Sequence, residues 1–231
     1  MSVKLAPIDG CVFDAYGTLF DFNAAAKRHA EALGDKWPEV SATWRRKQLE
    51  YSWLRSMMGD FADFWQVTRD ALVYALEKHG HEDNGLVEKL MTSYRTLEAY
   101  PEATSTLAWM KHLGLKIIIL SNGTQSMLTD AIAAAHLDRL VDAVLSVGAV
   151  SVYKPHPKVY QLAHSRLGVA PARICFVSSN GWDAVGAAHY GFRSVWINRN
   201  NEPRERLPAA AEVVIENLSE LQSLIARSET A

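Results

Sequence analysis

The chain has 231 residues, of which 48% are hydrophobic and 22% are charged, and its formal net charge is −2. Its length suits one large α/β domain or a core with a smaller insertion, and its hydrophobic content is enough for a buried core. So small a net charge provides no broad field for nucleic acid or an anionic membrane. No apolar run approaches the ~20 residues of a membrane span, and no signal peptide is visible. We therefore expect a cytoplasmic protein that binds neither nucleic acid nor membrane.

The two cysteines, Cys11 and Cys175, each lie inside an apolar run with the character of a strand. Buried thiols are typical of proteins in a reducing compartment, where disulfides are rare. The sequence leaves open whether the two side chains come close in space.

The N-terminal part begins with one strand and continues as helix. Residues 11–13 form an apolar strand that ends at Asp14, and a turn follows. From about residue 23 to residue 97 the apolar residues recur at helical spacing, which predicts helices rather than strands. The predicted helices cover residues 24–33, ended by Gly34; residues 41–58, with Ser41 as the N-cap; residues 64–79; and residues 86–97.

The rest of the chain alternates between strands and helices after Pro101, which opens a first helical turn. The predicted strands are residues 115–120, 143–147, 174–177 and 194–197, and the predicted helices are residues 125–135, 158–167 and 184–190. Strands separated by helices indicate a parallel, doubly wound sheet. We therefore predict the α/β class: a Rossmann-like doubly wound core, residues 1–20 and 99–231, with an inserted helical cap domain, residues 21–98. Such a cap would exclude water from the crevice at the strand ends.

Asp14 is the most informative residue because it stands where the first strand meets its turn. A carboxylate at the carboxyl end of a strand, in the crevice of an α/β sheet, is well placed to act as a nucleophile. A metal-dependent phosphotransferase with this layout would have a second carboxylate two residues later, as acid and base for the leaving oxygen. This sequence has Tyr16 at that position. The pattern therefore favours a leaving group that needs no proton, such as halide.

Polar residues also follow the later predicted strands. They are Ser121 and Asn122, then Lys154, then the run of residues 178–183 that ends with Asp183. Each feature alone has an ordinary structural explanation: an aspartate such as Asp14 often forms a turn, serine and asparagine cap helices, and an acidic residue in a first helical turn complements the helix dipole. Lys154 and the basic run at Arg45 could equally be solvated. The ordered set at successive strand ends is what predicts a site.

With these residues in place, the sequence closely resembles the L-2-haloacid dehalogenases of the haloacid dehalogenase superfamily. The resemblance covers nearly the whole chain, including the helical insertion. The matching strings are residues 13–20, 44–51, 120–123, 152–155 and 176–183.

The resemblance implies an (S)-2-haloacid dehalogenase, a hydrolase acting on carbon–halide bonds. Asp14 would displace halide from a short-chain L-2-haloalkanoic acid with inversion, and water would hydrolyse the resulting aspartyl ester to a D-2-hydroxy acid. The implied partners are a small 2-haloacid and water, with no metal and no cofactor. The resemblance also implies a homodimer, in which the apolar faces of the cap helices could form the contact.

The resemblance further assigns roles to individual residues. Lys154 would hold Asp14 ionised, Arg45 would face the departing halide, and Asp183 would activate the water. The implied catalytic set is Asp14, Thr18, Arg45, Ser121, Lys154, Tyr160, Ser178, Asn180 and Asp183. The implied substrate and halide contacts are Ala15, Tyr16, Arg45, Phe64, Ser121, Asn122 and Trp182.

Two other functions stay open at this point. A magnesium-dependent phosphatase of the same superfamily would have the same fold, although Tyr16 argues against it. A non-catalytic binding protein on this fold would have no need for Asp14, Arg45, Lys154 and Asp183 together.

Some features of the sequence leave questions open. Arg46 and Gly181 depart from the residues expected beside the matching strings, which could change the range of substrates. The preferred halogen, fluoride included, is not determined. Residues 79–83 hold two histidines and two carboxylates, but their spacing matches no metal site, and we expect an exposed loop there.

Overall fold

A parallel sheet forms the centre of the molecule. The computed structural model describes residue 5, residues 7–81 and residues 83–225. Within that part of the chain, six parallel strands pair in the order β3-β2-β1-β4-β5-β6. The strands are β1 (Gly10–Phe13), β2 (Lys116–Ser121), β3 (Ala143–Ser146), β4 (Ile174–Ser178), β5 (Arg193–Ile197) and β6 (Val213–Ile215). The predicted α/β class with a doubly wound sheet is confirmed.

The strand order decides where Asp14 lies. β1 is central, with β2 on one side and β4 on the other, and the chain winds outward from it in both directions. In open α/β sheets this reversal point leaves a crevice beyond the carboxyl ends of the strands, and ligands bind there. Asp14 is the first residue after β1, so the strand order places it at that crevice.

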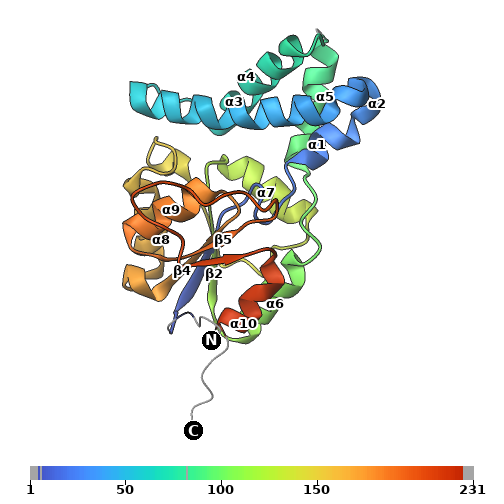
Figure 1. Ribbon diagram of the computed structural model, residues 1–231. Coiled ribbons are helices and arrows are strands. Elements are labelled where there is room, and N and C mark those ends of the chain that lie inside the picture. The colour runs from blue at the N-terminus through green and yellow to red at the C-terminus, as the bar shows by residue number, and fades with distance from the viewer. Residues whose placement is uncertain (1–4, 6, 82, 226–231) are drawn as a thin grey trace.

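Helices cover both faces of the sheet, with α8 and α9 on one side and α6 and α10 on the other (Figure 1). The central strands β1 and β4 are therefore buried on both faces, which explains why they read as continuous apolar runs. The helices of this part are α6 (Ala103–His112), α7 (Gln125–Ala134), α8 (Pro157–Leu167), α9 (Gly181–Tyr190) and α10 (Leu221–Ile225), with short 3-10 helices η2 (Val147–Ala149), η3 (Pro171–Arg173) and η4 (Leu218–Glu220).

Five helices, α1 to α5, form a layer over the carboxyl ends of the strands (Figure 1), and we call them the cap helices. The long α3 packs against α4, and the Trp44 indole nitrogen of α3 donates a hydrogen bond of 2.8 Å to the Thr68 carbonyl of α4. The cap helices are α1 (Asn23–Arg28), α2 (Ala30–Leu33), α3 (Trp37–Met58), α4 (Phe64–Lys78) and α5 (Asn84–Arg95), with η1 (Gly34–Lys36) before α3.

The chain enters and leaves the cap helices through two linkers that lie side by side. Phe20 forms an antiparallel bridge with Ala99. The Asp21 amide donates to the Glu98 carbonyl at 2.9 Å, and the Tyr100 amide donates to the Leu19 carbonyl at 2.9 Å. The turn that carries the nucleophile candidate is therefore hydrogen-bonded to the linker through which the chain returns.

The structure corrects two predictions about helix ends and adds one strand. The predicted helix 24–33 is broken at His29, whose ring forms a hydrogen bond of 2.8 Å with Ser93 of α5. Ser41 is not an N-cap, because α3 begins at Trp37 with a proline in its first turn. The Ser41 hydroxyl instead donates to the Asn23 side chain. The short edge strand β6 was not predicted, and the other predicted elements are present with small shifts at their ends.

Cys11 and Cys175 face each other in register on β1 and β4, and both are fully buried free thiols. Burial and the adjacent Cys175 thiol raise the pKa of Cys11 well above its usual value, which disfavours the reactive thiolate form. Among the described residues, no helix combines the length and the apolar character that crossing a membrane requires. Of the histidine-containing run 79–83, Glu82 lies outside the described residues.

Candidate active site

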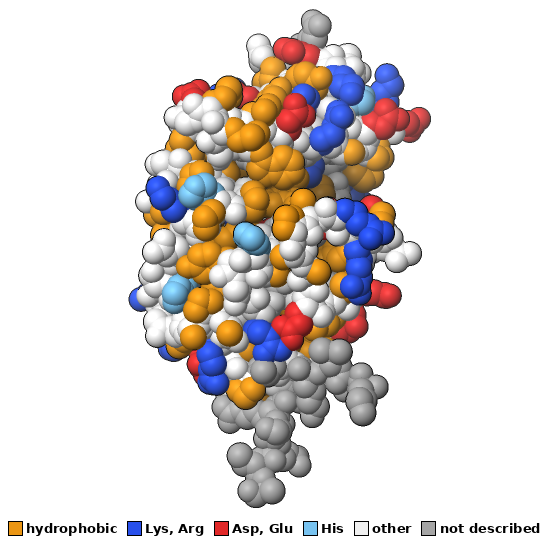
Figure 2. Space-filling model, turned by 60° about the vertical axis from the view of Figure 1, so that its left-hand side comes forward, with side chains coloured by type: hydrophobic (Ala, Val, Ile, Leu, Met, Phe, Trp, Pro, Cys, Tyr) orange, Lys and Arg blue, Asp and Glu red, His pale blue; other side chains and the backbone are white. Residues whose placement is uncertain are grey.

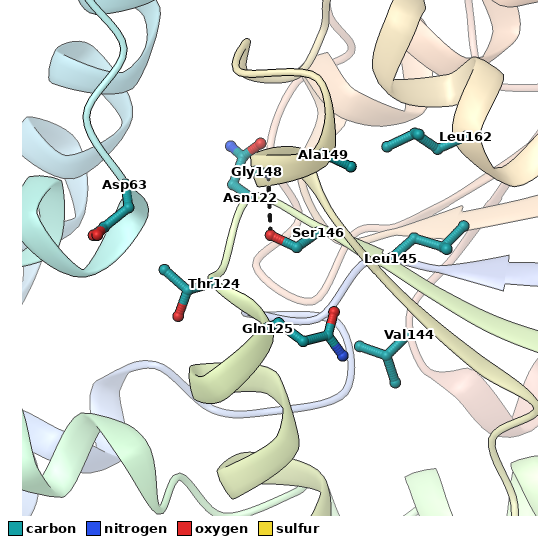
Figure 3. A pocket seen from close by; sticks show the side chains of 10 residues that line it. All are labelled: Asp63, Asn122, Thr124, Gln125, Val144, Leu145, Ser146, Gly148, Ala149 and Leu162. Carbon is teal, nitrogen blue, oxygen red and sulfur yellow. Dashed lines mark hydrogen bonds between the residues drawn. The ribbon is translucent and has the colours of Figure 1, made fainter.

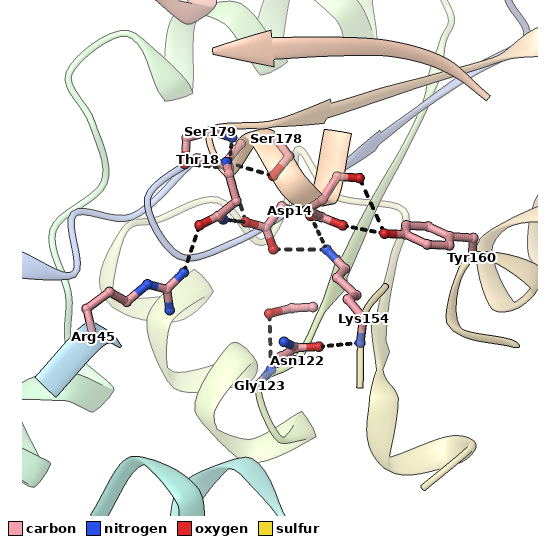
Figure 4. Close-up of polar contacts among 12 residues, drawn as sticks. Asp14, Thr18, Arg45, Asn122, Gly123, Lys154, Tyr160, Ser178 and Ser179 are labelled. Atoms are coloured by element: carbon pink, nitrogen blue, oxygen red, sulfur yellow. Dashed lines mark hydrogen bonds and ion pairs between the residues drawn. The ribbon is translucent and has the colours of Figure 1, made fainter. Parts of the chain in front are cut away.

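Asp14 lies buried at the end of β1 and accepts three hydrogen bonds from other side chains (Figure 4). The Lys154 ammonium lies 3.0 Å from one carboxylate oxygen. The other oxygen accepts from the Asn180 amide at 2.9 Å and from the Thr18 hydroxyl at 3.2 Å. One ammonium and two neutral donors therefore hold the Asp14 carboxylate in a fixed orientation.

Lys154 lies between two carboxylates, because its ammonium also contacts Asp183 at 2.9 Å. Only 1% of the Lys154 side chain and none of the Asp183 side chain is exposed. Burial alone would lower the pKa of Lys154, but the charges of Asp14 and Asp183 outweigh it, and the pKa lies above its usual value. Burial raises the pKa of Asp183 despite the adjacent ammonium. The cluster therefore contains one cation and two buried acids.

Tyr160 of α8 is the fourth side chain of this cluster and contacts Asp183. Its hydroxyl donates to Asp183 at 2.8 Å, on the oxygen that Lys154 does not contact. Burial and the Asp183 charge raise the pKa of Tyr160 well above its usual value, so the phenol remains a donor. Gly186 of α9 makes this approach possible, because a Cβ there would lie only 2.4 Å from the Tyr160 oxygen.

Arg45 projects from α3 toward the carboxyl ends of the strands and reaches Asp14 through Asn180 (Figure 4). The Arg45 guanidinium donates to the side-chain oxygen of Asn180 at 3.2 Å, while the side-chain nitrogen of Asn180 donates to Asp14. The other terminal nitrogen of the guanidinium donates to the Gln48 side-chain oxygen at 2.8 Å. The guanidinium carbon lies 5.0 Å from the centre of the Phe22 ring. A cation from the cap helices is thus connected to the nucleophile candidate by one amide side chain.

Gln48 holds Arg45 in place, and the sequence analysis did not identify it. It is buried, it accepts from Arg45, and its amide donates to Thr68 at 2.7 Å and to Tyr94 at 3.2 Å. The available signal was its position three residues after Arg45, which puts both on one face of α3. Nothing in the spacing, however, shows which side chains of α4 and α5 come close.

Tyr16 is buried among aromatic rings, and its hydroxyl has no hydrogen-bond partner within the described part of the chain. Its ring lies 6.0 Å from Phe64 and 5.3 Å from Tyr94. Burial raises the pKa of Tyr16 well above its usual value, so the group stays a neutral donor. A buried hydroxyl without a partner is unfavourable, and a bound ligand could accept its hydrogen bond.

Three further predicted residues accept hydrogen bonds from backbone amides near the site. The buried Ser121 hydroxyl accepts from the Gly123 amide at 3.1 Å, and Asn122 accepts from the Lys154 amide at 3.1 Å. The Ser178 hydroxyl accepts from the Asn180 amide rather than bonding to Asp14.

The predicted apolar contacts lie in two different surroundings. Ala15 and Phe64 are buried. Trp182 is half-buried, and its ring packs edge-on against Trp53 of α3 at 5.3 Å. Of the two unexpected residues noted in the sequence, Arg46 is exposed, while Gly181 lines the cleft described next.

A cleft of about 780 Å³ lies between the cap helices and the core, and Arg45 and Asn180 are part of its wall. Its walls also carry Arg199, Arg204 and Arg206 against two glutamates. Figure 2 shows the hollow between the two layers, with basic side chains beside it. This surface suits an anionic ligand, although the net charge of the chain is −2.

A second cavity, of about 440 Å³, is lined in part by Asn122 (Figure 3). It lies between Asp63 at the start of α4 and the ends of β3 and α7, and most of the residues that line it are apolar or neutral. Asn122 is the predicted site residue among them. Within the described part of the chain, no group of three or more histidine, cysteine or acidic side chains could hold a metal ion.

Residues 8–191 match the model of the haloacid dehalogenase-like hydrolases. The chain belongs to this family. It is 48% identical to (S)-2-haloacid dehalogenase 1 of Pseudomonas sp. (strain CBS-3), over 96% of this chain and 98% of that protein. It is 47% identical to (S)-2-haloacid dehalogenase 4A of Burkholderia cepacia, over 95% of this chain and 96% of that protein.

A solved structure supports the same relationship for this member of the family. The structure of L-2-haloacid dehalogenase from Xanthobacter autotrophicus with chloropropionic acid covalently bound has a TM-score of 0.88 to this chain at 38% identity. The match covers 96% of this chain and all of that one. In that relative, therefore, the enzyme forms a covalent bond with the haloacid.

Replacing Lys154 by methionine should destabilise the protein by about 3–5 kcal/mol, because two buried carboxylates would lose the charge that compensates them. Denaturant unfolding at neutral pH measures the change. The matched control is Lys158→Met, since Lys158 is exposed and forms no ion pair with any described residue. The control should change stability by no more than about 0.5 kcal/mol. Equal effects of the two substitutions would contradict the structural role given to Lys154.

Proposed function

We propose that this protein hydrolyses short-chain L-2-haloalkanoic acids to D-2-hydroxy acids through an ester on Asp14. One observation carries the proposal: the Asp14 carboxylate lies 3.0 Å from the Lys154 ammonium, while the residue two positions later is the buried Tyr16. The site thus offers a nucleophile without a carboxylate two residues later to protonate a leaving oxygen. Halide leaves without a proton, and the names of the most similar relatives supply the substrate class.

In the first step, a carboxylate oxygen of Asp14 attacks the halogen-bearing carbon from the side opposite the halide. The carbon–halogen bond breaks as the carbon–oxygen bond forms, so the centre inverts and no proton moves. Lys154 holds the attacking carboxylate in place, and Arg45 is the cation from the cap helices that stabilises the departing halide. The hydroxyls of Tyr16 and Ser121 and the amide of Asn122 are donors for the substrate carboxylate and halide.

In the second step, water attacks the side-chain carboxyl carbon of Asp14 and breaks its bond to the ester oxygen. Asp183 takes a proton from this water, and a proton reaches the hydroxyl group of the product, which regenerates the Asp14 anion and releases one proton to solvent. A base with a raised pKa is suited to this role near neutral pH, and burial raises the pKa of Asp183. Lys154 and Tyr160 keep the two Asp183 oxygens in place.

We further propose that residues 21–98 act as a separate cap domain on a core of residues 1–20 and 99–231. The paired linkers at Phe20 and Ala99 support this division, because the chain leaves and re-enters the core at one place. Arg45 and Asn180 come from opposite sides of this boundary and meet in the cleft. Closure of the cap would remove water from the first step and strengthen the interaction of Arg45 with the halide.

Location in the cytoplasm stays a prediction from the sequence.

The proposal predicts halide release from L-2-chloropropionate in buffer containing EDTA, with none from the D-enantiomer. Ion chromatography for chloride and chiral analysis of the lactate product measure the outcome. Asp14→Asn is the control, since it keeps the shape of the side chain but removes the nucleophilic anion, and it should release no chloride. Magnesium-dependent hydrolysis of a phosphate ester, with no chloride from either enantiomer, would instead support the phosphatase alternative.

Asp183→Asn should stop the second step while leaving the first, because halide displacement needs no base. We expect one equivalent of chloride, no further turnover, and a mass increase on the peptide that contains Asp14. In the unmodified enzyme, kcat should fall as the pH is lowered through the pKa of Asp183, since a base works only when ionised. That acid limb should lie above about pH 3.9, the usual pKa of an aspartate. Full turnover by Asp183→Asn would remove this residue from the mechanism.

We propose a homodimer in which the end of α3 contributes to the contact. Met57 and Met58 there are 75% and 68% exposed, which is unusual for large apolar side chains. Light scattering at working concentration should give twice the mass of the 25.7 kDa chain. Met58→Glu should shift the mass toward the monomer, whereas a monomeric unmodified protein would refute the proposal.

A further inference from the structure

Arg199, just after β5, makes an unusual number of contacts for a side chain outside the predicted site. Its guanidinium donates to the Thr18 carbonyl at 3.2 Å, to the Gly17 carbonyl at 3.4 Å and to Glu102 at 2.7 Å. Its carbon centre lies 3.7 Å from the centre of the Tyr100 ring. A planar group with five N–H donors can make these contacts together, and a lysine cannot.

The two carbonyls belong to the turn that follows the nucleophile candidate. Within the described part of the chain, Arg199 provides the hydrogen bonds found for the carbonyls of Gly17 and Thr18. The hydroxyl of the same Thr18 donates to Asp14 at 3.2 Å and accepts from the Ser179 amide at 2.8 Å. The position of the Thr18 backbone therefore affects how the Asp14 carboxylate is aimed.

The other two contacts of Arg199 lie on the linker that returns from the cap helices. Tyr100 is the linker residue whose amide bonds to the Leu19 carbonyl, and Glu102 directly precedes α6. The side chains of Arg199 and Glu102 are only 18% and 17% exposed, so this ion pair is largely shielded from solvent. One guanidinium thus joins the end of β5, the nucleophile turn and the linker.

We propose that Arg199 is a positioning residue that fixes the turn after Asp14 against the return linker of the cap. This inference rests on the proposed dehalogenase function for its kinetic consequence and on the contacts above for its structural one. Arg199 acts on the reaction through Thr18 and the backbone of the turn. Loss of the guanidinium frees two carbonyls of the turn, and the aim of Asp14 becomes less well defined.

The experiment compares Arg199→Ala and Arg199→Lys with the unmodified protein. Chloride release in a single turnover measures the first step, and steady-state kinetics separates kcat from KM. A misplaced nucleophile should lower the first-step rate and kcat by about 100-fold in Arg199→Ala. KM should change little, because uniform binding of substrate is not affected. Arg199→Lys should be intermediate, since it keeps a charge beside Glu102 but cannot bond to both carbonyls.

Two control variants separate positioning from charge. Arg139→Ala removes an exposed arginine that lies outside the cleft and bonds to no described residue, and it should retain the kcat of the unmodified protein. Glu102→Gln keeps a hydrogen-bond acceptor for Arg199 and leaves the two carbonyl contacts in place, so it should be milder than Arg199→Ala.

Hydrogen exchange gives a readout that does not depend on turnover. Deuterium uptake in the peptide that spans residues 14–20 should rise in Arg199→Ala and stay unchanged in Arg139→Ala. If the unmodified protein releases no halide, the proposed function fails, and this exchange result still decides the role of Arg199.

Several outcomes would overturn the inference. They are unchanged exchange in the turn, a kcat within about twofold of the unmodified protein, a raised KM with unchanged kcat, or an equal loss in Arg139→Ala. If Arg199→Ala does not fold, Arg199→Lys is the variant that tests the proposal. A kcat and a deuterium uptake equal to those of the unmodified protein would then refute it.

Discussion

The buried ion cluster at Lys154 is the constraint on which the rest of the site depends. Two carboxylates, Asp14 and Asp183, lie in a nearly water-free region, where an isolated charge would be strongly unfavourable. One ammonium within 3.0 Å of both makes the arrangement possible. The pair attraction alone does not offset the loss of hydration, so the remaining oxygens also need donors, and Thr18, Asn180 and Tyr160 provide them.

The sheet topology brings these donors and acceptors together. Asp14, Lys154 and Asn180 follow three different strands, and parallel strands place all their carboxyl ends at one edge. The two carboxylates are then separated in function by their surroundings. Asp14 is oriented by its donors and lies on the side of the cap helices. The two Asp183 oxygens are bound by the Lys154 ammonium and by the Tyr160 hydroxyl. In the proposed reaction, the nucleophile and the base can therefore be the same type of side chain.

The cap helices contribute a cation rather than a further acid. Arg45 is positioned by Gln48, which is itself fixed by α4 and α5 through Thr68 and Tyr94. The packing of three cap helices therefore sets where this charge lies relative to Asp14. An anionic substrate that approaches an anionic nucleophile needs such compensation, because like charges at close range repel strongly where water is scarce.

The sequence by itself determined the α/β class and the position of the helical insertion, and it predicted the polar residues at the strand ends that the structure brings together. These follow from local signals: apolar runs and helical spacing, and polar residues directly after predicted strands. Only the tertiary structure decided the helix break at His29, the support of Arg45 by Gln48 and the contacts of Arg199. Each of these depends on residues distant along the chain: Ser93 for His29, Thr18 for Arg199, and Thr68 and Tyr94, which fix Gln48. Spacing within one element reports which face a residue occupies, whereas the packing of different elements decides what that face meets.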